Sequence, residues 1–528
     1  MEANTKSNWW DHAVGYEIYI RSFADGNGDG IGDFVGMLDK LDYLAWLGVD
    51  VLWITPFYES PMRDWGYDVA NYVAIDKIYG SLDDFDAVVE KAHSLGMKII
   101  ADIVPNHCSD QHEWFQQALA DPTSKYRDYF IWHDVPEDGS LPNNWVGYFG
   151  GTVWTLEPQS GQYYMHLFLP TQPDLNWRNP AVREEFEQIL RFWLERGIDG
   201  FRIDVAQGMV KDEQLRSNEQ LTPVDDSMSR DDQWNGFDHQ HDILQPESLA
   251  IYQAWNKIAA EYDALLLGET YDLIMLDKLD RLLSSGDAIH VGFWFGAMHV
   301  DWEAEQIRST LALPLEEISA GLGWAQNSHD EHRSVTRFGG GDLGRARALA
   351  LAVLLAGLPG LPFLYQGEEL GLPSGVVAAE DKLDPVGGDD PNAGRDGTRT
   401  PIPWQPGEGM GFTDPGVRPW LPFGGRTDDD TASVQRDNPD SIVHRYRQLL
   451  QVRKSVSQIA GAPLEWIDAG DDVVAFRRGD VAFIANTSSE PTASLVQGEL
   501  LFSTRDDGRE SRDMLGPDEG RIVVVTQP

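Results

Sequence analysis

The sequence GFRIDV, at residues 200–205, decides the fold and supplies the first candidate functional groups. Side chains alternate across a β-strand, so Arg202 and Asp204 point to one face and the neighbouring apolar residues point to the other. A charged pair in so apolar a strand costs desolvation free energy unless it has a task. The pair could hold the fold together as a buried ion pair, or it could keep Asp204 ionised and oriented beside a cation.

Short apolar runs resembling residues 200–205 recur along the chain, with helical patterns between them. The other predicted strands are Gly15–Ile20, Val51–Thr55, Lys98–Val104, Ala264–Gly268, Ile289–Phe295, Gly323–Gln326 and Pro362–Gln366. The helical patterns include Phe34–Leu47, Leu82–Leu95, Pro180–Arg196 and Ser248–Tyr262. Eight strands alternating with helices predict parallel βαβ units of the α/β class, closed into a (β/α)8 TIM barrel.

Four segments depart from this alternation and predict further organisation. We expect the barrel over residues 1–107 and 177–458, with an inserted subdomain after the third strand at residues 108–176, rich in Trp, Tyr, Gly and Pro. A C-terminal antiparallel β-domain is predicted for residues 459–528, from the alternating runs Leu464–Ile467, Val473–Arg477, Val481–Asn486 and Arg521–Thr526. The long irregular stretches Asp212–Gln245 and Leu372–Asp430 are predicted to be functional loops.

Composition limits the classes of partner and the compartment. The 528 residues carry a formal net charge of −45, which disfavours nucleic acid and anionic lipid as partners and favours a neutral or cationic substrate over a phosphorylated one. Cys108 is the single cysteine, so no intramolecular disulfide can form. Residues Met1–His12 contain no apolar core of a signal peptide. Both observations predict a cytoplasmic protein.

One apolar stretch, Ala346–Tyr365, is long enough to raise the question of a membrane span. It is interrupted by the sequence GLPGLP at residues 357–362. This punctuation favours a buried helix, a turn and a buried strand instead.

Acidic residues follow several predicted strands, and in a TIM barrel such positions share one face. They are Asp204, Glu269 and Asp330, accompanied by His107 and His329. Paired carboxylates across a bond are the usual apparatus for glycoside hydrolysis, in which one acid is ionised and the other holds a proton. Arg202 suits Asp204 to the first role, and the apolar run before Glu269 suits it to the second. A metal site is an alternative, but no H-x-H or H-x-x-x-H spacing supports it.

With these residues in place, the chain resembles the α-amylase superfamily, glycoside hydrolase family 13, and most closely its α-glucosidase and oligo-1,6-glucosidase branch. The resembling motifs occur in order at residues 102–107, 172–176, 200–204, 269 and 329–330. The resemblance implies that Asp204 is the nucleophile, Glu269 the acid/base, and Asp330 a carboxylate that binds sugar hydroxyls. It also implies that His107, Arg202 and His329 contact sugar hydroxyls or the nucleophile.

Further residues resemble the pocket of the glucosidase branch. The sequence DWGYD at residues 64–68 is similar to a loop whose Asp64 and Tyr67 close the pocket on the terminal glucose. Residues 395–401 are similar to a segment whose second arginine, Arg399, reaches the same pocket, and an Asp64–Arg399 pair would enforce exo action. Phe149 and Phe168 look like the branch's pocket aromatics, although ordinary subdomain core explains them equally well.

The sequence departs from the branch at two places. Ser328 stands directly before His329-Asp330, where the branch commonly has Asn, and Asn327 precedes it. Val205 after the nucleophile is typical of relatives that prefer α-1,6 bonds, but Gln207 is a further departure. The linkage therefore stays open between α-1,4 and α-1,6.

The sequence DGNGDGIGD at residues 25–33 suggests a cation site, because oxygen ligands at alternate positions suit a hard cation. Position 12 of an EF-hand loop would be Gly36, so the segment is not an EF-hand. It is similar to the branch's single-cation loop, which implies ligands from the side chains of Asp25, Asn27, Asp29 and Asp33 and the carbonyl of Ile31. The cation would be structural, Ca²⁺ or Mg²⁺, and a glycine-rich turn with solvated acids is the alternative. No organic cofactor is expected.

The resemblance implies a retaining, exo-acting α-glucosidase that removes glucose from the non-reducing end of short α-glucosides. A transglucosidase, sucrose isomerase or trehalose synthase would share the first chemical step. A non-enzymatic relative of the kind that partners membrane transporters is a third hypothesis, which the presence of all three acids disfavours. We expect a small oligosaccharide or glucoside as the ligand, no nucleic acid or membrane partner, and a monomer or homodimer.

Overall fold

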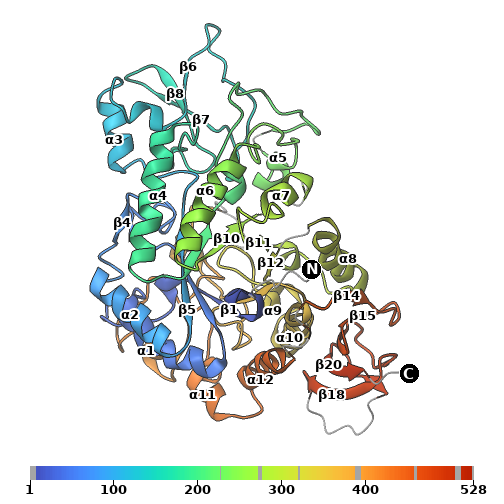
Figure 1. Ribbon diagram of the computed structural model, residues 1–528. Coiled ribbons are helices and arrows are strands. Elements are labelled where there is room, and N and C mark those ends of the chain that lie inside the picture. Colours follow the sequence, from blue (N-terminus) through green and yellow to red (C-terminus); the bar gives the residue numbers. More distant parts are fainter. Residues whose placement is uncertain are drawn as a thin grey trace. The chain divides into compact units, whose positions relative to one another are not determined.

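The computed structural model describes residues 8–225, 227–270, 276–318, 321–386, 394–456, 459, 461–505 and 513–525. Eight strands form a closed barrel in the order β1-β13-β12-β11-β10-β9-β5-β2 (Figure 1). They are β1 (Gly15–Ile18), β2 (Val51–Ile54), β5 (Lys98–Ile103), β9 (Gly200–Ile203), β10 (Leu265–Glu269), β11 (Val291–Trp294), β12 (Gly321–Trp324) and β13 (Leu361–Tyr365). All eight predicted strands are confirmed, and with them the (β/α)8 class.

Strand β9 ends earlier than predicted. Val205 has φ 45° and ψ 48°, in the left-handed region, so the chain turns out of the strand directly after Asp204. Asp204 itself remains tied to the sheet, because its N–H donates to the carbonyl of Ile103 at 2.9 Å. In the parallel register of β5 and β9, Asp102 lies opposite Arg202.

The helices begin at residues suited to capping. Asp33 accepts the N–H of Gly36 at the start of α1, Ser81 forms a capping box with Asp84 at α2, and Asn179 precedes a proline at the start of α4. The longer helices are α1 (Phe34–Leu47), α2 (Leu82–Ser94), α4 (Pro180–Glu195), α6 (Ser248–Glu261), α8 (Ala304–Glu317), α10 (Gly341–Gly357) and α12 (Ile442–Ser455). The shorter ones are α3 (Glu113–Ala120), α5 (Arg230–Trp234), α7 (Leu276–Leu283), α9 (Ser334–Arg337) and α11 (Ala432–Asp437).

The chain divides into two compact units. The first comprises Met1–Ile54, Ile78–Ile99 and Phe293–Pro528, and the second comprises Thr55–Lys77 and Ile100–Gly292. Helices α1 and α2 pack together in the first unit, and α4 and α6 pack together in the second (Figure 1). The division into domains predicted from the sequence remains a prediction.

Helix α10 is the central helix of the first unit, and its residues from Ala348 onward are buried. One side packs against α12, and another packs against β16 and β20 of the C-terminal sheet. Gly357 permits this close approach, because a Cβ there would lie 2.3 Å from the ring of Phe483. The apolar stretch from residue 346 to residue 365 is therefore a buried helix, a turn and strand β13, as predicted. Among the described residues, no helix has the length and hydropathy needed to cross a membrane.

The C-terminal antiparallel domain is confirmed as a five-stranded sheet in the order β14-β15-β16-β20-β18. Its strands are β14 (Leu464–Trp466), β15 (Val473–Arg478), β16 (Val481–Asn486), β18 (Gly498–Ser503) and β20 (Gly520–Val525), beside the pair β17 (Thr492–Ala493) and β19 (Met514–Leu515). The sequence pattern misses β18 because this edge strand buries only Phe502 and so lacks an alternating pattern. Thr526, included in a predicted strand, lies outside the described residues.

The second unit contains a small sheet between β5 and α4. It has the order β6-β8-β7, formed by β6 (Trp132–Asp134), β7 (Trp154–Glu157) and β8 (Gln162–Met165). A two-stranded ribbon of β3 (Tyr58–Glu59) and β4 (Asn71–Ile75) precedes it in the chain. Helix α3 was not expected in this segment, and at two turns it is too short to give clear helical periodicity.

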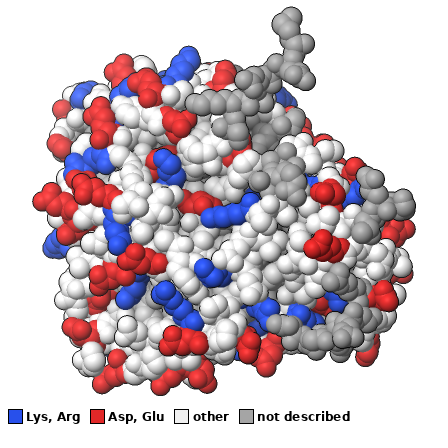
Figure 2. All heavy atoms as spheres, turned by 60° about the horizontal axis from the view of Figure 1, so that its bottom comes forward, with Lys and Arg blue, Asp and Glu red and all other residues white. Residues whose placement is uncertain are grey.

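The excess of acidic residues is distributed over the surface. On the face drawn in Figure 2, Asp and Glu side chains are spread widely and Lys and Arg side chains lie among them. No single basic patch of the kind that binds nucleic acid is visible on that face of the described chain.

A buried carboxyl in the first unit makes its stability depend on pH. The hydroxyls of Tyr16 and Tyr43 donate to Oε1 of Glu369 at 3.1 and 3.0 Å, and within the described residues Oε2 has no hydrogen-bond partner. Burial raises the pKa of Glu369 to about 7, although these hydrogen bonds act in the opposite direction. The folded state therefore binds this proton more tightly than the unfolded state does.

We predict that Glu369→Gln is more stable than the parent protein at alkaline pH. The stability that the protonated carboxyl confers is complete below the ordinary pKa of Glu and is lost as pH rises through about 7, a change on the order of 3 kcal/mol. Thermal unfolding between about pH 5 and pH 9 measures this change. Glu305→Gln, on the exposed surface of α8, is the control and should follow the parent protein at every pH.

Candidate active site

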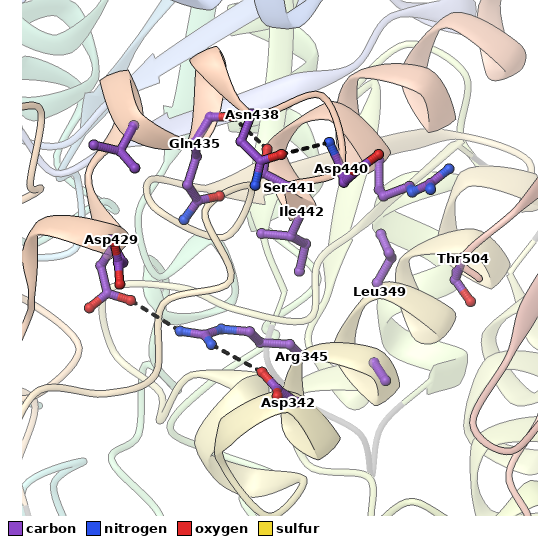
Figure 3. A pocket seen from close by; sticks show the side chains of 14 residues that line it. Asp342, Arg345, Leu349, Asp429, Gln435, Asn438, Asp440, Ser441, Ile442 and Thr504 are labelled. Atoms are coloured by element: carbon purple, nitrogen blue, oxygen red, sulfur yellow. Dashed lines mark hydrogen bonds and ion pairs between the residues drawn. The ribbon is translucent and has the colours of Figure 1, made fainter. Parts of the chain in front are cut away.

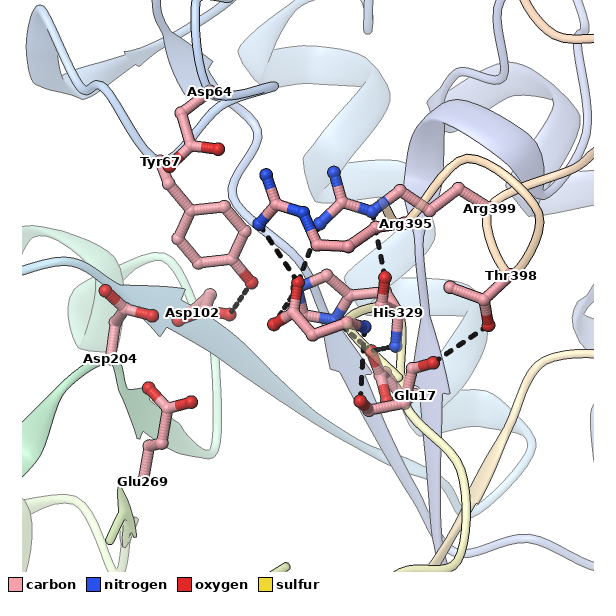
Figure 4. A network of polar contacts seen from close by, with 12 residues as sticks. Glu17, Asp64, Tyr67, Asp102, Asp204, Glu269, His329, Arg395, Thr398 and Arg399 are labelled. Carbon is pink, nitrogen blue, oxygen red and sulfur yellow. Dashed lines mark hydrogen bonds and ion pairs between the residues drawn. The ribbon is translucent and has the colours of Figure 1, made fainter. Parts of the chain in front are cut away.

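The candidate catalytic centre of the second unit is built around the guanidinium of Arg202, which is 1% exposed. Nη1 donates to Asp102 at 3.0 and 3.1 Å and to Asp204 at 2.7 Å, while Nη2 lies 2.9 Å from Oε1 of Glu269. Figure 4 shows Asp204 and Glu269 near one another, as two neighbouring strands present them. The two acids predicted as a catalytic pair therefore share one arginine.

The topology of the barrel explains this meeting. Strands β5, β9 and β10 are consecutive in the sheet, and their parallel registers place Arg202 opposite Asp102 on one side and opposite Leu267 on the other. Asp204 follows β9 and Glu269 is the last residue of β10. Carboxyl ends of parallel strands lie at the same edge, so residues far apart in the sequence converge there.

Burial and neighbouring charges act together on Asp204. Burial and the negative charge of Glu269 raise the pKa of Asp204 well above its ordinary value, while Arg202 acts in the opposite direction. One guanidinium is shared among Asp102, Asp204 and Glu269, so its positive charge offsets the effect of burial only in part. The role of Asp204 as the ionised member of a catalytic pair stays a prediction.

Val205 positions the second acid through its backbone. Its N–H donates to Oε2 of Glu269 at 2.7 Å. The left-handed conformation of Val205 is costly for a β-branched residue, and it is adopted directly after Asp204. The strained backbone of Val205 thus lies where the segment carrying Asp204 is hydrogen-bonded to the side chain of Glu269.

The predicted pocket residues of the second unit are brought together. The hydroxyl of Tyr67 donates to Asp102 at 3.1 Å, as Figure 4 shows, and the backbone carbonyl of Tyr67 lies 3.0 Å from Nε2 of His107. Gln172, from the motif at residues 172–176, donates to Asp64 at 3.1 Å and lies 3.1 Å from the same His107 nitrogen. Burial lowers the pKa of His107, so a neutral ring is favoured.

Asp68 holds the loop that carries two of these residues. It accepts hydrogen bonds from the hydroxyl of Ser60 at 2.9 Å and from the N–H groups of Arg63 and Asp64 at 2.9 and 3.1 Å. Burial raises the pKa of Asp68 to about 6, and these hydrogen bonds oppose that rise. The last residue of the DWGYD sequence therefore fixes the position of the first.

The two predicted pocket aromatics pack edge to face. The rings of Phe149 and Phe168 are 5.4 Å apart at 83°, and both residues are half-buried. Phe168 also lies 4.9 Å from the ring of His107. Sequence reasoning missed Tyr148, which stacks on Phe168, and Trp234, which stacks on Tyr148. Only their position in the inserted segment and in the irregular stretch after β9 could have indicated them.

Sequence reasoning also missed a buried lysine. Nζ of Lys211 lies 2.7 Å from Asp174 and 2.6 Å from the amide oxygen of Asn106, and all three residues are buried. The ion pair joins the segment after β9 to the motif at residues 172–176, and the hydrogen bond joins it to the residue before His107. The sequence feature that could have identified Lys211 is its place as a lysine among acidic residues in the loop directly after strand β9.

A second group of predicted residues lies in the first unit and surrounds Asp330. Arg399 reaches Asp330 at 2.7 Å, Arg395 reaches it at 3.2 Å, and Nε2 of His329 lies at 3.2 Å. The other nitrogen of His329 contacts Glu17, from β1, as Figure 4 shows. Glu17 and Arg395 were not predicted as site residues. The predicted Asp64–Arg399 pair joins residues of different units and stays a prediction.

The departure at Ser328 has a structural explanation. The hydroxyl of Ser328 accepts the N–H of Asp330 at 3.2 Å, a turn that fixes the backbone of the acid. The preceding Asn327 is buried and donates to Glu368 at 2.6 Å. The side-chain amide of Asn327 is thus engaged inside the fold, and the hydroxyl of Ser328 holds the loop that carries Asp330.

The glycine-rich loop at residues 25–33 uses its oxygen atoms for backbone hydrogen bonds. Asp25 accepts the N–H groups of Gly28 and Gly30 at 2.7 Å each, and Asp29 accepts that of Ile31 at 2.9 Å. The oxygen donor set has the chemistry a hard cation prefers. In the described part of the chain, however, no group of three or more His, Cys, Asp or Glu side chains is arranged to hold a metal ion.

A separate pocket in the first unit has a volume of about 830 Å³ (Figure 3). Its lining mixes Arg345 with acids such as Asp342 and Asp429 over an apolar base that includes Leu349 and Ile442. None of the predicted site residues lines it, and it contains no aromatic ring that could stack on a sugar. We do not place the reaction there.

We predict that Lys211→Met lowers the free energy of unfolding by about 3–5 kcal/mol, because it leaves the buried carboxylate of Asp174 without its cation. Denaturant unfolding measures this loss. The control is Lys91→Met, which breaks the exposed pair with Asp42 and should cost at most about 1 kcal/mol. Equal losses in the two variants would contradict the structural role of Lys211.

Comparison with known proteins agrees with this geometry. A sequence model of the α-amylase catalytic domain matches residues 17–461. A "probable alpha-glucosidase" of Rhizobium meliloti (strain 1021) is 39% identical over 89% of this chain and 87% of its own length. An oligo-1,6-glucosidase of Parageobacillus thermoglucosidasius is 33% identical over 98% of this chain and 99% of its own.

A solved structure extends the match to the whole fold. The crystal structure of the α-glucosyl transfer enzyme XgtA shares 37% identity, with a TM-score of 0.92, over 99% of this chain and all of that one. Sequence motifs, barrel topology and the paired acids at the strand ends are thus found together in one chain. The protein belongs to the α-amylase family, glycoside hydrolase family 13.

Proposed function

We propose that the protein is a retaining, exo-acting α-glucosidase that hydrolyses short α-glucosides from their non-reducing ends. The meeting of Asp204 and Glu269 on adjacent nitrogens of Arg202 carries this proposal. Two carboxyls on one guanidinium are close enough to act on a single anomeric carbon, as a double displacement requires. The α-glucosidase and oligo-1,6-glucosidase relatives support the same assignment.

The reaction proceeds in two balanced steps. The carboxylate of Asp204 attacks C1 of the terminal glucose, while the carboxyl of Glu269 gives its proton to the departing glycosidic oxygen. The bond from C1 to that oxygen breaks and a covalent glucosyl–Asp204 ester forms. Glu269, now ionised, takes a proton from water, whose oxygen attacks C1. The ester bond from C1 to Asp204 breaks, so glucose leaves with its configuration retained, the carboxylate of Asp204 is restored and Glu269 is protonated again.

The remaining predicted residues hold the glucose. We assign Tyr67, His107 and Asp64 to hydroxyl binding and assign Phe149 and Phe168 to the apolar wall, supported by their contacts in the second unit. Asp330, with His329 and Arg399, is assigned to the hydroxyls of the same sugar on the strength of its motif. Exo action rests on the predicted Asp64–Arg399 pair.

A second candidate function is transfer of the glucosyl group to a sugar or alcohol. The likeness to an α-glucosyl transfer enzyme favours it specifically. The first step is the same, and the acceptor replaces water in the second. We place hydrolysis first because curated relatives along nearly the whole chain are glucosidases. A cytoplasmic location and a monomeric or dimeric state are further proposals, which cell fractionation and size-exclusion chromatography would test.

We predict that the protein releases glucose from at least one of maltose, isomaltose, sucrose, trehalose, kojibiose, nigerose and an aryl α-glucoside. NMR should show α-glucose as the first product, since two displacements restore the configuration. Asp204→Asn removes the nucleophile and should lower kcat by about 10⁴-fold or more. A single cooperative thermal transition in this variant shows that the fold is retained. First appearance of β-glucose would contradict the covalent route, and transfer products dominating at all substrate concentrations would favour the second candidate.

We also propose a structural hard cation at residues 25–33, bound by oxygen atoms of Asp25, Asn27, Asp29, Asp33 and the carbonyl of Ile31. The alternating oxygen donors of the sequence support it, and no catalytic step depends on it. We predict that EDTA lowers Tm and that Ca²⁺ restores it. Asp29→Asn keeps an oxygen for the Ile31 N–H but removes a charge, so it should weaken the response to Ca²⁺. A Tm indifferent to both reagents would refute the site.

A further inference from the structure

Four aromatic rings of the second unit form one continuous stack. Phe168 and Tyr148 lie 5.0 Å apart at 24°, Tyr148 and Trp234 lie 4.0 Å apart at 19°, and Trp234 and His239 lie 3.6 Å apart at 14°. We call these four residues the aromatic stack. It begins at Phe168, beside His107, and ends at a histidine in the loop that follows the nucleophile strand.

The stack joins two segments that are distant in sequence. Tyr148 and Phe168 come from the segment between β5 and α4, whereas Trp234 ends α5 and His239 follows it. Tyr148 has ring neighbours at both sides, so its faces are used within the protein. Because Phe168 and Trp234 both pack on the ring of Tyr148, a shift of one of these rings displaces the next. Little of the Tyr148 ring is left to contact a ligand.

His239 has an unusual set of partners. Its Nδ1 lies 2.7 Å from the carboxylate of Asp242, and its Nε2 lies 2.8 Å from the backbone carbonyl of Trp234. A carboxylate and a carbonyl can only accept hydrogen bonds, so both contacts are satisfied at once when both ring nitrogens carry a proton and the ring is an imidazolium. The ring is 2% exposed beside a fully buried Asp242.

A cation parallel to an indole face is favourable, most of all where water is excluded. The imidazolium of His239 covers Trp234 in this way, and Asp242 balances its charge. Among the described residues, Lys211 also interacts electrostatically with Asp242, and its ammonium is engaged with Asp174. Loss of the His239 proton would set a lone pair against an acceptor oxygen and weaken the end of the stack.

A hydrogen bond ties the middle of the stack to the nucleophile segment. Nε2 of Gln207 donates to the hydroxyl of Tyr148 at 3.3 Å. Gln207 lies three positions after Asp204. Its backbone carbonyl accepts a hydrogen bond from the N–H of Leu244 at 2.8 Å. The stack thus contacts the pocket wall at one end and the nucleophile segment at its centre.

We propose that Trp234 and His239 are positioning residues, which hold Phe168 in the pocket wall through Tyr148 and do so only while His239 is an imidazolium. This inference rests on the proposed function, because Phe168 is assigned there to the wall of the glucose site. Neither residue touches the reacting atoms. Their effect on the reaction passes through the order of the wall and hence through substrate binding.

The first test is a double-mutant cycle on the hydrolysed glucoside of the panel. Trp234→Ala should raise KM about tenfold with a smaller change in kcat, and Trp234→Phe, which keeps a flat ring, should restore KM to within about threefold. Because Trp234 acts through Phe168, Trp234→Ala combined with Phe168→Ala should raise KM little more than Phe168→Ala alone. Additive effects, or a parent-like KM in Trp234→Ala, would overturn the proposal.

Two controls separate positioning from general damage. Tyr163→Ala removes a half-buried ring from β8 of the same unit and should leave KM unchanged. Thermal unfolding of every variant shows whether the fold is retained. Should Trp234→Ala fail to fold, the comparison of Trp234→Phe with Trp234→Leu, an apolar side chain that cannot stack, replaces it with the same expected difference in KM.

The second test is the pH dependence of KM. In the parent protein KM should rise at alkaline pH as His239 loses its proton, whereas His239→Gln, which carries no such proton, should show a raised KM without that alkaline rise. An alkaline rise that persists in His239→Gln would overturn the role of the imidazolium. If no glucoside of the panel is hydrolysed, the proposed function fails, and the same variants are compared by calorimetric binding of D-glucose. Equal glucose affinity in the parent and in Trp234→Ala, or no binding to the parent, would then refute the stack's role.

Discussion

The candidate centre depends on one buried guanidinium. Arg202 gathers three carboxylates from consecutive strands, two of them the proposed catalytic pair. A buried cation among several acids is strongly held, and removing it would leave uncompensated charge in the barrel. The three carboxylates outnumber this one cation, and burial with the charge of Glu269 raises the pKa of Asp204. Two carboxyls at one site, one ionised and one protonated, are what the proposed glycoside hydrolysis requires.

The rest of the second unit is built to keep this cluster in place. The hydroxyl of Tyr67 fixes Asp102, the backbone N–H of Val205 fixes Glu269, and Lys211 fastens the segment behind His107. These supports come from loops and strand ends of very different sequence positions. Each uses a buried or partly buried polar contact. Such contacts are strong where water is excluded, and leaving one partner unsatisfied is costly.

Much of the fold could be predicted from the sequence, because buried parallel strands such as residues 200–205 carry an apolar signal that depends only on local pattern. Acidic residues at the ends of predicted strands then identified Asp204 and Glu269 as a candidate pair, since the carboxyl ends of parallel strands lie at one edge. What the sequence pattern does not show depends on tertiary context. The pKa of Asp204 follows from burial and from charges brought together in three dimensions, which no linear motif records. Edge strand β18 has no alternating burial, and Trp234 and His239 acquire meaning only through partners in another segment.

The close approach at Gly357 has a consequence for how the chain can be altered. Because helix α10 is buried between α12 and the C-terminal sheet, that sheet completes the hydrophobic core of the first unit and is no detachable appendage. Ending the polypeptide before β14 would expose the apolar residues of α10 to water. An exposed apolar surface of this kind promotes aggregation. Engineers who wish to shorten this enzyme or to graft another module onto it should therefore leave the terminal sheet intact.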